Sequence, residues 1–140
     1  MAKRAKRSGR AGVATTQPLV AVIDDDESMR ESLPDLLREL GFAAQAFPSA
    51  EDFLASGNAA ATRCLLLDVA MPGMSGPQLH RELTLRGQQI PTIFITARVN
   101  EAARRQLIEQ GAVECLFKPF SEQQLRTALD AALRGNEGRV

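Results

Sequence analysis

Apolar and polar segments alternate along the chain from residue 19 onward. Four short apolar runs, at residues 19–23, 64–67, 91–95 and 112–117, each end on a polar or charged residue. Runs of this length and composition are typical of strands buried on both faces of a parallel sheet. Between the first two runs, apolar residues recur at helical spacing, as in residues 29–40. The alternation therefore predicts a parallel sheet with helices on both faces and right-handed crossovers.

The pattern divides into five strands and five helices. We expect strands at residues 19–24, 42–47, 64–69, 92–96 and 113–117. We expect helices at about 28–40, 50–55, 77–86, 100–110 and 121–134, with residues 57–62 as a loop. The residues suited to helix starts are Ser28 or an acid just before it, Ser49 and Ser121, and those suited to helix ends are Gly41, Gly111 and Gly135. Pro34 is the exception, because proline inside a helix costs a hydrogen bond and should kink the helix or delay its start.

Polar side chains close the four apolar runs. They are Asp24, Asp25 and Asp26 after the first run, Asp68 after the second, Thr96 after the third and Lys118 after the fourth. The carboxyl ends of parallel strands share one edge of the sheet, where open α/β folds place their ligands, so we expect these groups to meet there. Any one of these acids could equally be a solvated turn residue, but that explanation does not account for all four strand ends together.

Carboxylates, a hydroxyl and an amine at one sheet edge suit a divalent cation and a phosphoryl group. Asp68 is anchored by the apolar run before it and can act as a nucleophile that forms an acyl phosphate. Asp24 and Asp25 can supply the oxygen ligands that Mg²⁺ takes in proteins. Thr96 and Lys118 can contact phosphoryl oxygens. Clustered carboxylates repel one another, so such a site favours binding of a cation.

Composition indicates one globular domain preceded by a basic segment. The 140 residues are 44% hydrophobic and 24% charged, which suits a single domain. Residues 1–17 carry five basic residues and no acid, so the remainder carries 12 basic and 17 acidic residues, a net charge of −5. We expect residues 1–17 to be a flexible basic tail, either a solubilising or start-site extension or a segment in contact with nucleic acid or an acidic partner. The acidic remainder is expected to be a poor nucleic-acid binder.

Cysteine and apolar patterns bear on the cellular compartment. Cys64 and Cys115 lie inside apolar runs and lack metal-site spacing, which fits reduced core residues of a cytoplasmic protein. We expect no membrane association, because no apolar stretch approaches the roughly 20 residues of a membrane span.

The chain resembles the receiver domain of bacterial two-component response regulators over about residues 19–134. The motifs that carry the resemblance are Val22-Ile-Asp-Asp-Asp26, Leu67-Asp68 followed by Met71-Pro-Gly-Met-Ser-Gly76, Ile95-Thr96-Ala97 and Phe117-Lys-Pro-Phe120. The residues of these motifs resemble those in receivers of nodulation and nitrogen-fixation regulators. The resemblance implies a flavodoxin-like, doubly wound five-stranded parallel sheet with strand order 2-1-3-4-5. It also implies a receiver domain over residues 18–136 and a C-terminal tail at 137–140.

The resemblance also implies a role for each site residue. Asp68 would be phosphorylated by a sensor histidine kinase or a histidine phosphotransfer protein. Thr96 would be the switch hydroxyl and Lys118 the amine that contacts the phosphoryl group, with a cis bond between Lys118 and Pro119. The implied ligands of Mg²⁺, with Mn²⁺ as an alternative, are Asp24, Asp25, Asp68 and the backbone carbonyl of Ala70.

Two positions depart from the family pattern. Cys115 stands where the family usually has a Tyr or Phe whose ring moves with the switch. We therefore expect the switch either to depend on backbone movement of the fourth helix and fifth strand or to be weaker. Ala70 stands where larger side chains often flank the phosphoryl group, so we expect altered access for water or a donor imidazole. Asp26 matches a variable position and stays outside the metal set.

These features predict a phosphorelay module, and not an enzyme beyond self-catalysed phosphoryl transfer and hydrolysis. Phosphorylation would switch a protein-binding surface on the fourth helix, fifth strand and fifth helix toward an unidentified downstream protein, with a phosphorylation-dependent homodimer as one form of that switch. One alternative is a phosphotransfer intermediate or phosphate sink between histidine proteins. Another is the receiver part of a longer DNA-binding transcriptional regulator, since residues 135–140 resemble a linker. A phosphohydrolase is disfavoured, because Ala70 stands where its acid–base aspartate belongs.

Several other residues have simpler explanations. His80, the only histidine, is expected to be an exposed helix residue, and Met71 and Met74 to be packing residues. Arg104 and Arg105 fit either a partner contact or a solvated helix face.

Overall fold

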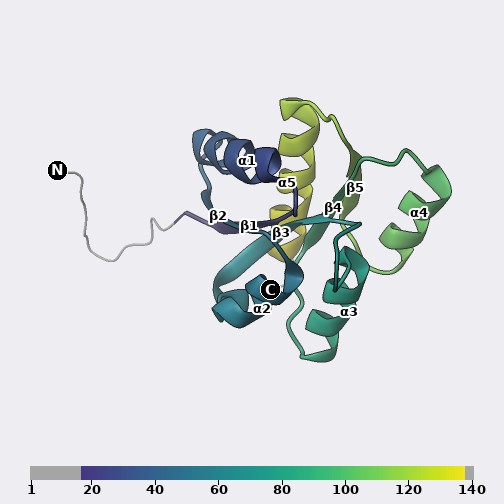
Figure 1. The fold of residues 1–140 in the computed structure, drawn as a ribbon. Coiled ribbons are helices and arrows are strands. Elements are labelled where there is room, and N and C mark those ends of the chain that lie inside the picture. Colours follow the sequence, from purple (N-terminus) through teal and green to yellow (C-terminus); the bar gives the residue numbers. More distant parts are fainter. Residues whose placement is uncertain (1–16, 138–140) are drawn as a thin grey trace.

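A computed structural model describes residues 17–137 of the chain and has one sheet of five parallel strands in the order β2-β1-β3-β4-β5 (Figure 1). The strands are β1 (Leu19–Ile23), β2 (Ala43–Phe47), β3 (Thr62–Asp68), β4 (Thr92–Thr96) and β5 (Glu114–Phe117). The helices are α1 (Glu27–Glu39), α2 (Ala50–Ser56), the short 3₁₀ helix η3 (Ala59–Ala61), α3 (Gly76–Leu85), α4 (Glu101–Glu109) and α5 (Glu122–Glu137). The flavodoxin-like fold and strand order are confirmed. The predicted tail at residues 1–17 falls, except for residue 17, outside the described residues, as do residues 138–140.

The sheet divides the core into two layers, which strand alternation produces. In β3, Leu65 and Leu67 face the layer under α2, α3 and α4, whereas Cys64 and Leu66 face the layer under α1 and α5 (Figure 1). The four side chains are fully buried. Burial of β3 on both faces holds the backbone of Asp68, the last residue of this strand, in place.

Most predicted helix ends are confirmed, with two corrections. Of the predicted caps for α1, Ser28 or an acid just before it, the acid Asp26 caps the helix, since its carboxylate accepts a hydrogen bond from the Ser28 backbone N–H at 2.9 Å. Helix α1 runs through Pro34 without interruption, and because this proline is buried, packing of its ring offsets the lost hydrogen bond. Helix α5 continues past Gly135 to Glu137, so the predicted stop at Gly135 is wrong.

The predicted loop at residues 57–62 is also wrong in part. Residues 59–61 form η3, and β3 already begins at Thr62, whose hydroxyl donates to the Asn58 carbonyl at 2.8 Å. A single 3₁₀ turn between Gly57 and β3 has too few residues to show a helical period in the sequence.

Strand register aligns the carboxyl ends of the central strands. Ile23 pairs with Leu67, so Asp24 follows β1 at the level where Asp68 ends β3. Asp68 pairs with Ile95, and Thr96 pairs with Phe117. The strands that position Asp24, Asp68, Thr96 and Lys118 therefore end at nearly the same level along the edge of the sheet.

Gly76 allows the start of α3 to approach β3 closely. A Cβ at this position would overlap the carbonyl oxygen of Asp68 and lie 3.2 Å from Phe94 Cε1. The Gly76 N–H donates to the Val69 carbonyl at 3.0 Å, which closes the intervening loop. The glycine is thus required by space rather than by backbone conformation.

We expect Gly76→Ala to lower the free energy of unfolding by about 2 kcal/mol, because the methyl group has no room beside Asp68. The control is Gly87→Ala, at a left-handed position (φ 78°) with nothing near the added Cβ, which should cost about 1 kcal/mol through backbone strain alone. Urea unfolding followed by far-ultraviolet circular dichroism measures both. Equal losses in the two variants would contradict a steric role for Gly76.

Candidate functional site: an acidic cluster at the carboxyl edge of the sheet

Three carboxylates from two strand ends lie together. Asp24, Asp25 and Asp68 each offer an oxygen within 4.8 Å of those of the other two. Asp24 is fully buried and Asp68 is 7% exposed, whereas Asp25 is exposed. Hard oxygen donors on one open side suit Mg²⁺, which keeps some of its waters. The cluster that the sequence predicted is therefore assembled by the fold, and its donors fit the ion.

Asp24 is the most constrained member of the cluster. Its Oδ2 accepts from Lys118 Nζ at 2.9 Å, and its Oδ1 accepts from the Asp26 backbone N–H at 2.9 Å. The Lys118 side chain is 18% exposed. Arg30 Nη1 donates to the Asp24 carbonyl at 3.0 Å. A buried carboxylate requires such compensation, so Lys118 reaches across the sheet edge to neutralise it.

The surroundings of Asp68 make its charged form costly. Burial, followed by the hydrogen bond and the negative charge of Asp24, raises the pKa of Asp68 to about 7, although the Lys118 ammonium opposes the rise. A cation held by the three carboxylates would favour the ionised form, which is the nucleophilic one.

Thr96 and Lys118 reach the site from β4 and from the end of β5. The Lys118 N–H donates to the Thr96 carbonyl at 2.8 Å, which ties the two strand ends together. The Thr96 hydroxyl is half-buried and accepts from the Arg98 N–H at 3.1 Å, so its own hydrogen can still donate. The Lys118–Pro119 bond is cis, as predicted.

Ala70 and Cys115, the two positions that depart from the family pattern, lie in different surroundings. Ala70 is exposed in the turn that follows Asp68. Cys115 is 3% exposed and packs in the core layer that contains Phe94 and Leu107. Both Cys64 and Cys115 are buried free thiols, and burial raises the pKa of Cys115 to about 11, so its side chain is neutral at physiological pH.

The sequence did not predict the hydrogen bonds to the backbone of Cys115 or the ion pair beside it. Arg104 of α4 donates through Nε to the Cys115 carbonyl at 3.2 Å and pairs through Nη2 with Glu114 at 2.5 Å. The same Glu114 oxygen accepts from the Cys115 N–H at 2.9 Å. The sequence had marked Arg104 as a contact or solvated residue, but its pairing with β5 depends on how α4 packs.

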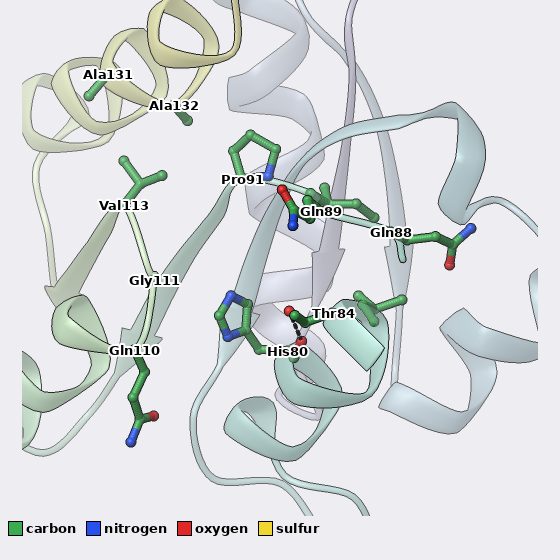
Figure 2. A pocket seen from close by; sticks show the side chains of 12 residues that line it. His80, Thr84, Gln88, Gln89, Pro91, Gln110, Gly111, Val113, Ala131 and Ala132 are labelled. Carbon is green, nitrogen blue, oxygen red and sulfur yellow. Dashed lines mark hydrogen bonds between the residues drawn. The ribbon is translucent and has the colours of Figure 1, made fainter. Parts of the chain in front are cut away.

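His80 is not the exposed residue that the sequence predicted. It is half-buried and packs edge-on against Phe94, with ring centroids 5.8 Å apart, and burial lowers the pKa of its imidazole. It lines a cavity of about 340 Å³ between α3 and the ends of α4 and α5 (Figure 2). The cavity lies at the amino ends of β4 and β5, and the acidic cluster has no residue in it. Met71 and Met74 are packing residues, as predicted.

The chain is similar to proteins that fit this geometry. The family model for the response regulator receiver domain matches residues 20–130. Response regulator protein TodT of Pseudomonas putida is 38% identical over 128 residues, which are 91% of this chain and 56% of TodT. Nodulation protein W of Bradyrhizobium diazoefficiens is 40% identical over 126 residues, 90% of this chain and 56% of that protein. The chain thus spans a little over half the length of these relatives.

Solved structures show the same fold. The response regulator StyR superposes with a TM-score of 0.80 at 42% identity and covers 89% of this chain and 63% of its own. The structure titled FixJ-N superposes with a TM-score of 0.75 at 34% identity, covering 86% and 96% of the two chains. Within residues 17–137, no helix combines the length and apolar character that crossing a membrane requires. The chain belongs to the response regulator receiver family and is a receiver domain of the kind found in two-component response regulators.

Proposed function

We propose that Asp68 accepts a phosphoryl group from a phosphohistidine of a sensor kinase or phosphotransfer protein. The observation that carries this proposal is the burial of Asp68 beside Asp24, which is itself paired with Lys118. A carboxylate oxygen of Asp68 would attack phosphorus, forming an O–P bond as the donor's N–P bond breaks. The bonding pair would return to the imidazole nitrogen.

Residues of this chain would position that transfer. Asp24, Asp25, Asp68 and the Ala70 carbonyl would hold Mg²⁺, which when bound neutralises charge on the phosphoryl oxygens. Lys118, at 2.9 Å from Asp24, is near enough in the cluster to shift toward those oxygens. The Thr96 hydroxyl has a hydrogen to donate to the same group. These four strand ends would thus bind the phosphoryl group from several sides.

The switch would run from Thr96 along β5 to α4. Thr96 and Lys118 share a backbone hydrogen bond, and Cys115 lies three residues earlier on β5. With a small thiol at that position, Arg104 is the side chain that links the β5 backbone to α4. Movement of Thr96 toward the phosphoryl group would therefore reach α4 through Arg104 and alter the surface formed by α4, β5 and α5.

A transcriptional output is the second candidate. Relatives of this chain include the transcriptional regulatory proteins TdiR of Thauera aromatica and FixJ of Azorhizobium caulinodans, each 38% identical. In that case the altered surface would act on a DNA-binding region or promote a homodimer in the cytoplasm. A phosphate sink would instead return the phosphoryl group to a histidine protein without a change in partner affinity. Partner binding by the phosphorylated and unphosphorylated protein distinguishes these outcomes.

Incubation with acetyl phosphate and Mg²⁺ should add about 80 Da to the intact protein, one phosphoryl group. The gain should vanish with EDTA and in Asp68→Asn, which keeps the side-chain shape but is a poor nucleophile. Intact mass spectrometry measures the gain. If neither acetyl phosphate nor any histidine kinase phosphorylates the wild type, the proposal is wrong.

We expect stability to fall as pH rises without a divalent cation. The pKa of Asp68 is about 7 in the folded protein and near 3.8 otherwise, so the folded state holds a proton that the unfolded chain has released. The contribution of protonated Asp68 to the free energy of unfolding is complete below about pH 4 and is lost as pH rises through about 7. Asp68→Asn should flatten this slope and, above pH 7, raise the melting temperature by roughly 3 °C or more.

Thermal unfolding by circular dichroism, with and without Mg²⁺, measures this dependence. Mg²⁺ should stabilise the wild type above pH 7 more than it stabilises Asp68→Asn, because the variant lacks one ligand. Parallel pH profiles in the two proteins would show that Asp68 does not titrate in this range.

Arg104→Ala should uncouple α4 from β5 while leaving phosphorylation of Asp68 within about twofold of wild type, because Arg104 lies outside the acidic cluster. Phosphorylation-induced chemical-shift changes in α4 should shrink. Arg105→Ala, an exposed neighbour on the same helix, is the matched control and should leave those changes intact. Equal responses of the two variants would rule out transmission through Arg104.

A further inference from the structure

The loop between Asp68 and α3 is fastened at both ends. The Val69 N–H donates to the Ile95 carbonyl at 3.0 Å, and the Gly76 N–H donates to the Val69 carbonyl at 3.0 Å. Ala70 lies inside this loop and is exposed. Met71, the next residue, is buried in the core, whereas Pro72 and Gly73 at the loop tip are exposed. The tip therefore needs a further contact to hold the loop in one conformation beside Asp68.

Glu51 of α2 binds that tip. Its Oε2 accepts a hydrogen bond from the Met74 N–H at 2.9 Å, across 23 residues of sequence. The neighbouring Gly73 has φ 75°, and a Cβ there would lie 2.7 Å from the same carboxylate oxygen. The hydrogen bond from Met74 lowers the pKa of Glu51, so the carboxylate stays ionised and the bond is charge-assisted. The loop and the carboxylate therefore fit each other closely.

The helix that presents Glu51 is itself rigidly supported. Ala50 and Phe53 are fully buried, and Phe53 packs edge-on against Phe47 with ring centroids 5.3 Å apart. Ser49 caps the helix by accepting from the Asp52 N–H at 3.0 Å. A contact from a fixed element restrains a loop more than a contact from another loop would.

We infer that Glu51 is a positioning residue for the phosphoacceptor site. By holding Met74 it restrains, together with the buried Met71, the loop that begins at Asp68, and so helps to preset the Ala70 carbonyl as a metal ligand. This inference rests on the proposed function, which assigns Ala70 to the Mg²⁺ site. Glu51 is not part of the acidic cluster of Asp24, Asp25 and Asp68 and would act on it only through the loop.

Three variants test the inference. Glu51→Ala removes the acceptor, Glu51→Gln keeps a neutral acceptor of the same length, and Asp52→Ala removes a neighbouring acid from the same helical turn. Amide hydrogen exchange of Met74, followed by nuclear magnetic resonance without any metal, reports the loop contact directly. Mg²⁺ titration followed by the same spectra gives the dissociation constant, and intact mass gives the rate of phosphorylation by acetyl phosphate.

In Glu51→Ala we expect faster exchange at Met74 and a Mg²⁺ dissociation constant raised roughly threefold or more, with a matching loss in phosphorylation rate at low Mg²⁺. Saturating Mg²⁺ should restore most of that rate, which a merely destabilised fold would not allow. Glu51→Gln should recover exchange protection and affinity to within about twofold, and Asp52→Ala should match wild type.

Two results would overturn the inference. One is faster Met74 exchange in Glu51→Ala with an unchanged Mg²⁺ dissociation constant, because the contact would then not reach the site. The other is equal weakening in Asp52→Ala, which would assign the effect to loss of negative charge. A wild type that takes up no phosphoryl group would instead count against the proposed function, while the exchange data would still report on Glu51.

Discussion

The site depends on one costly arrangement, the burial of two aspartates side by side at the carboxyl edge of the sheet. Asp24 is fully buried, and Asp68 is nearly so. Loss of hydration, together with the hydrogen bond and charge of Asp24, raises the pKa of Asp68 to about 7, while the ammonium group of Lys118 offsets the charge of Asp24. The arrangement persists because β1 and β3 are held by packing on both faces. A divalent cation or a phosphoryl group with its metal would relieve the imbalance.

Long-range side-chain contacts then connect this edge to the rest of the molecule. Glu51 fastens the loop after Asp68 to α2, and Arg104 fastens the backbone of Cys115 to α4. Both contacts join a helix to a backbone group, so they restrain the main chain rather than a mobile side chain. The first contact comes from α2 and the second from α4, so the site is connected to two separate helices.

Cys115 affects how β5 is connected to α4. Cys115 is buried, and its thiol is small and neutral, so the proposed switch would depend little on this side chain. The ion pair between Arg104 and Glu114 occupies the N–H and C=O of Cys115 instead. Coupling between β5 and α4 would therefore be electrostatic and backbone-based in this chain.

The sequence by itself predicted the parallel sheet and the residues of the acidic cluster, and the strand order came from the resemblance of its motifs to receiver domains. Short apolar runs ending on Asp24, Asp68, Thr96 and Lys118 are local signals, and parallel strands bring their ends together by geometry alone. Tertiary structure decided what local patterns do not encode. Lys118 pairs with Asp24, α1 continues through Pro34, and His80 is half-buried against Phe94 only because of how the elements pack. Tertiary structure also paired Glu51 with Met74 and Arg104 with Glu114, because such contacts depend on how distant elements pack.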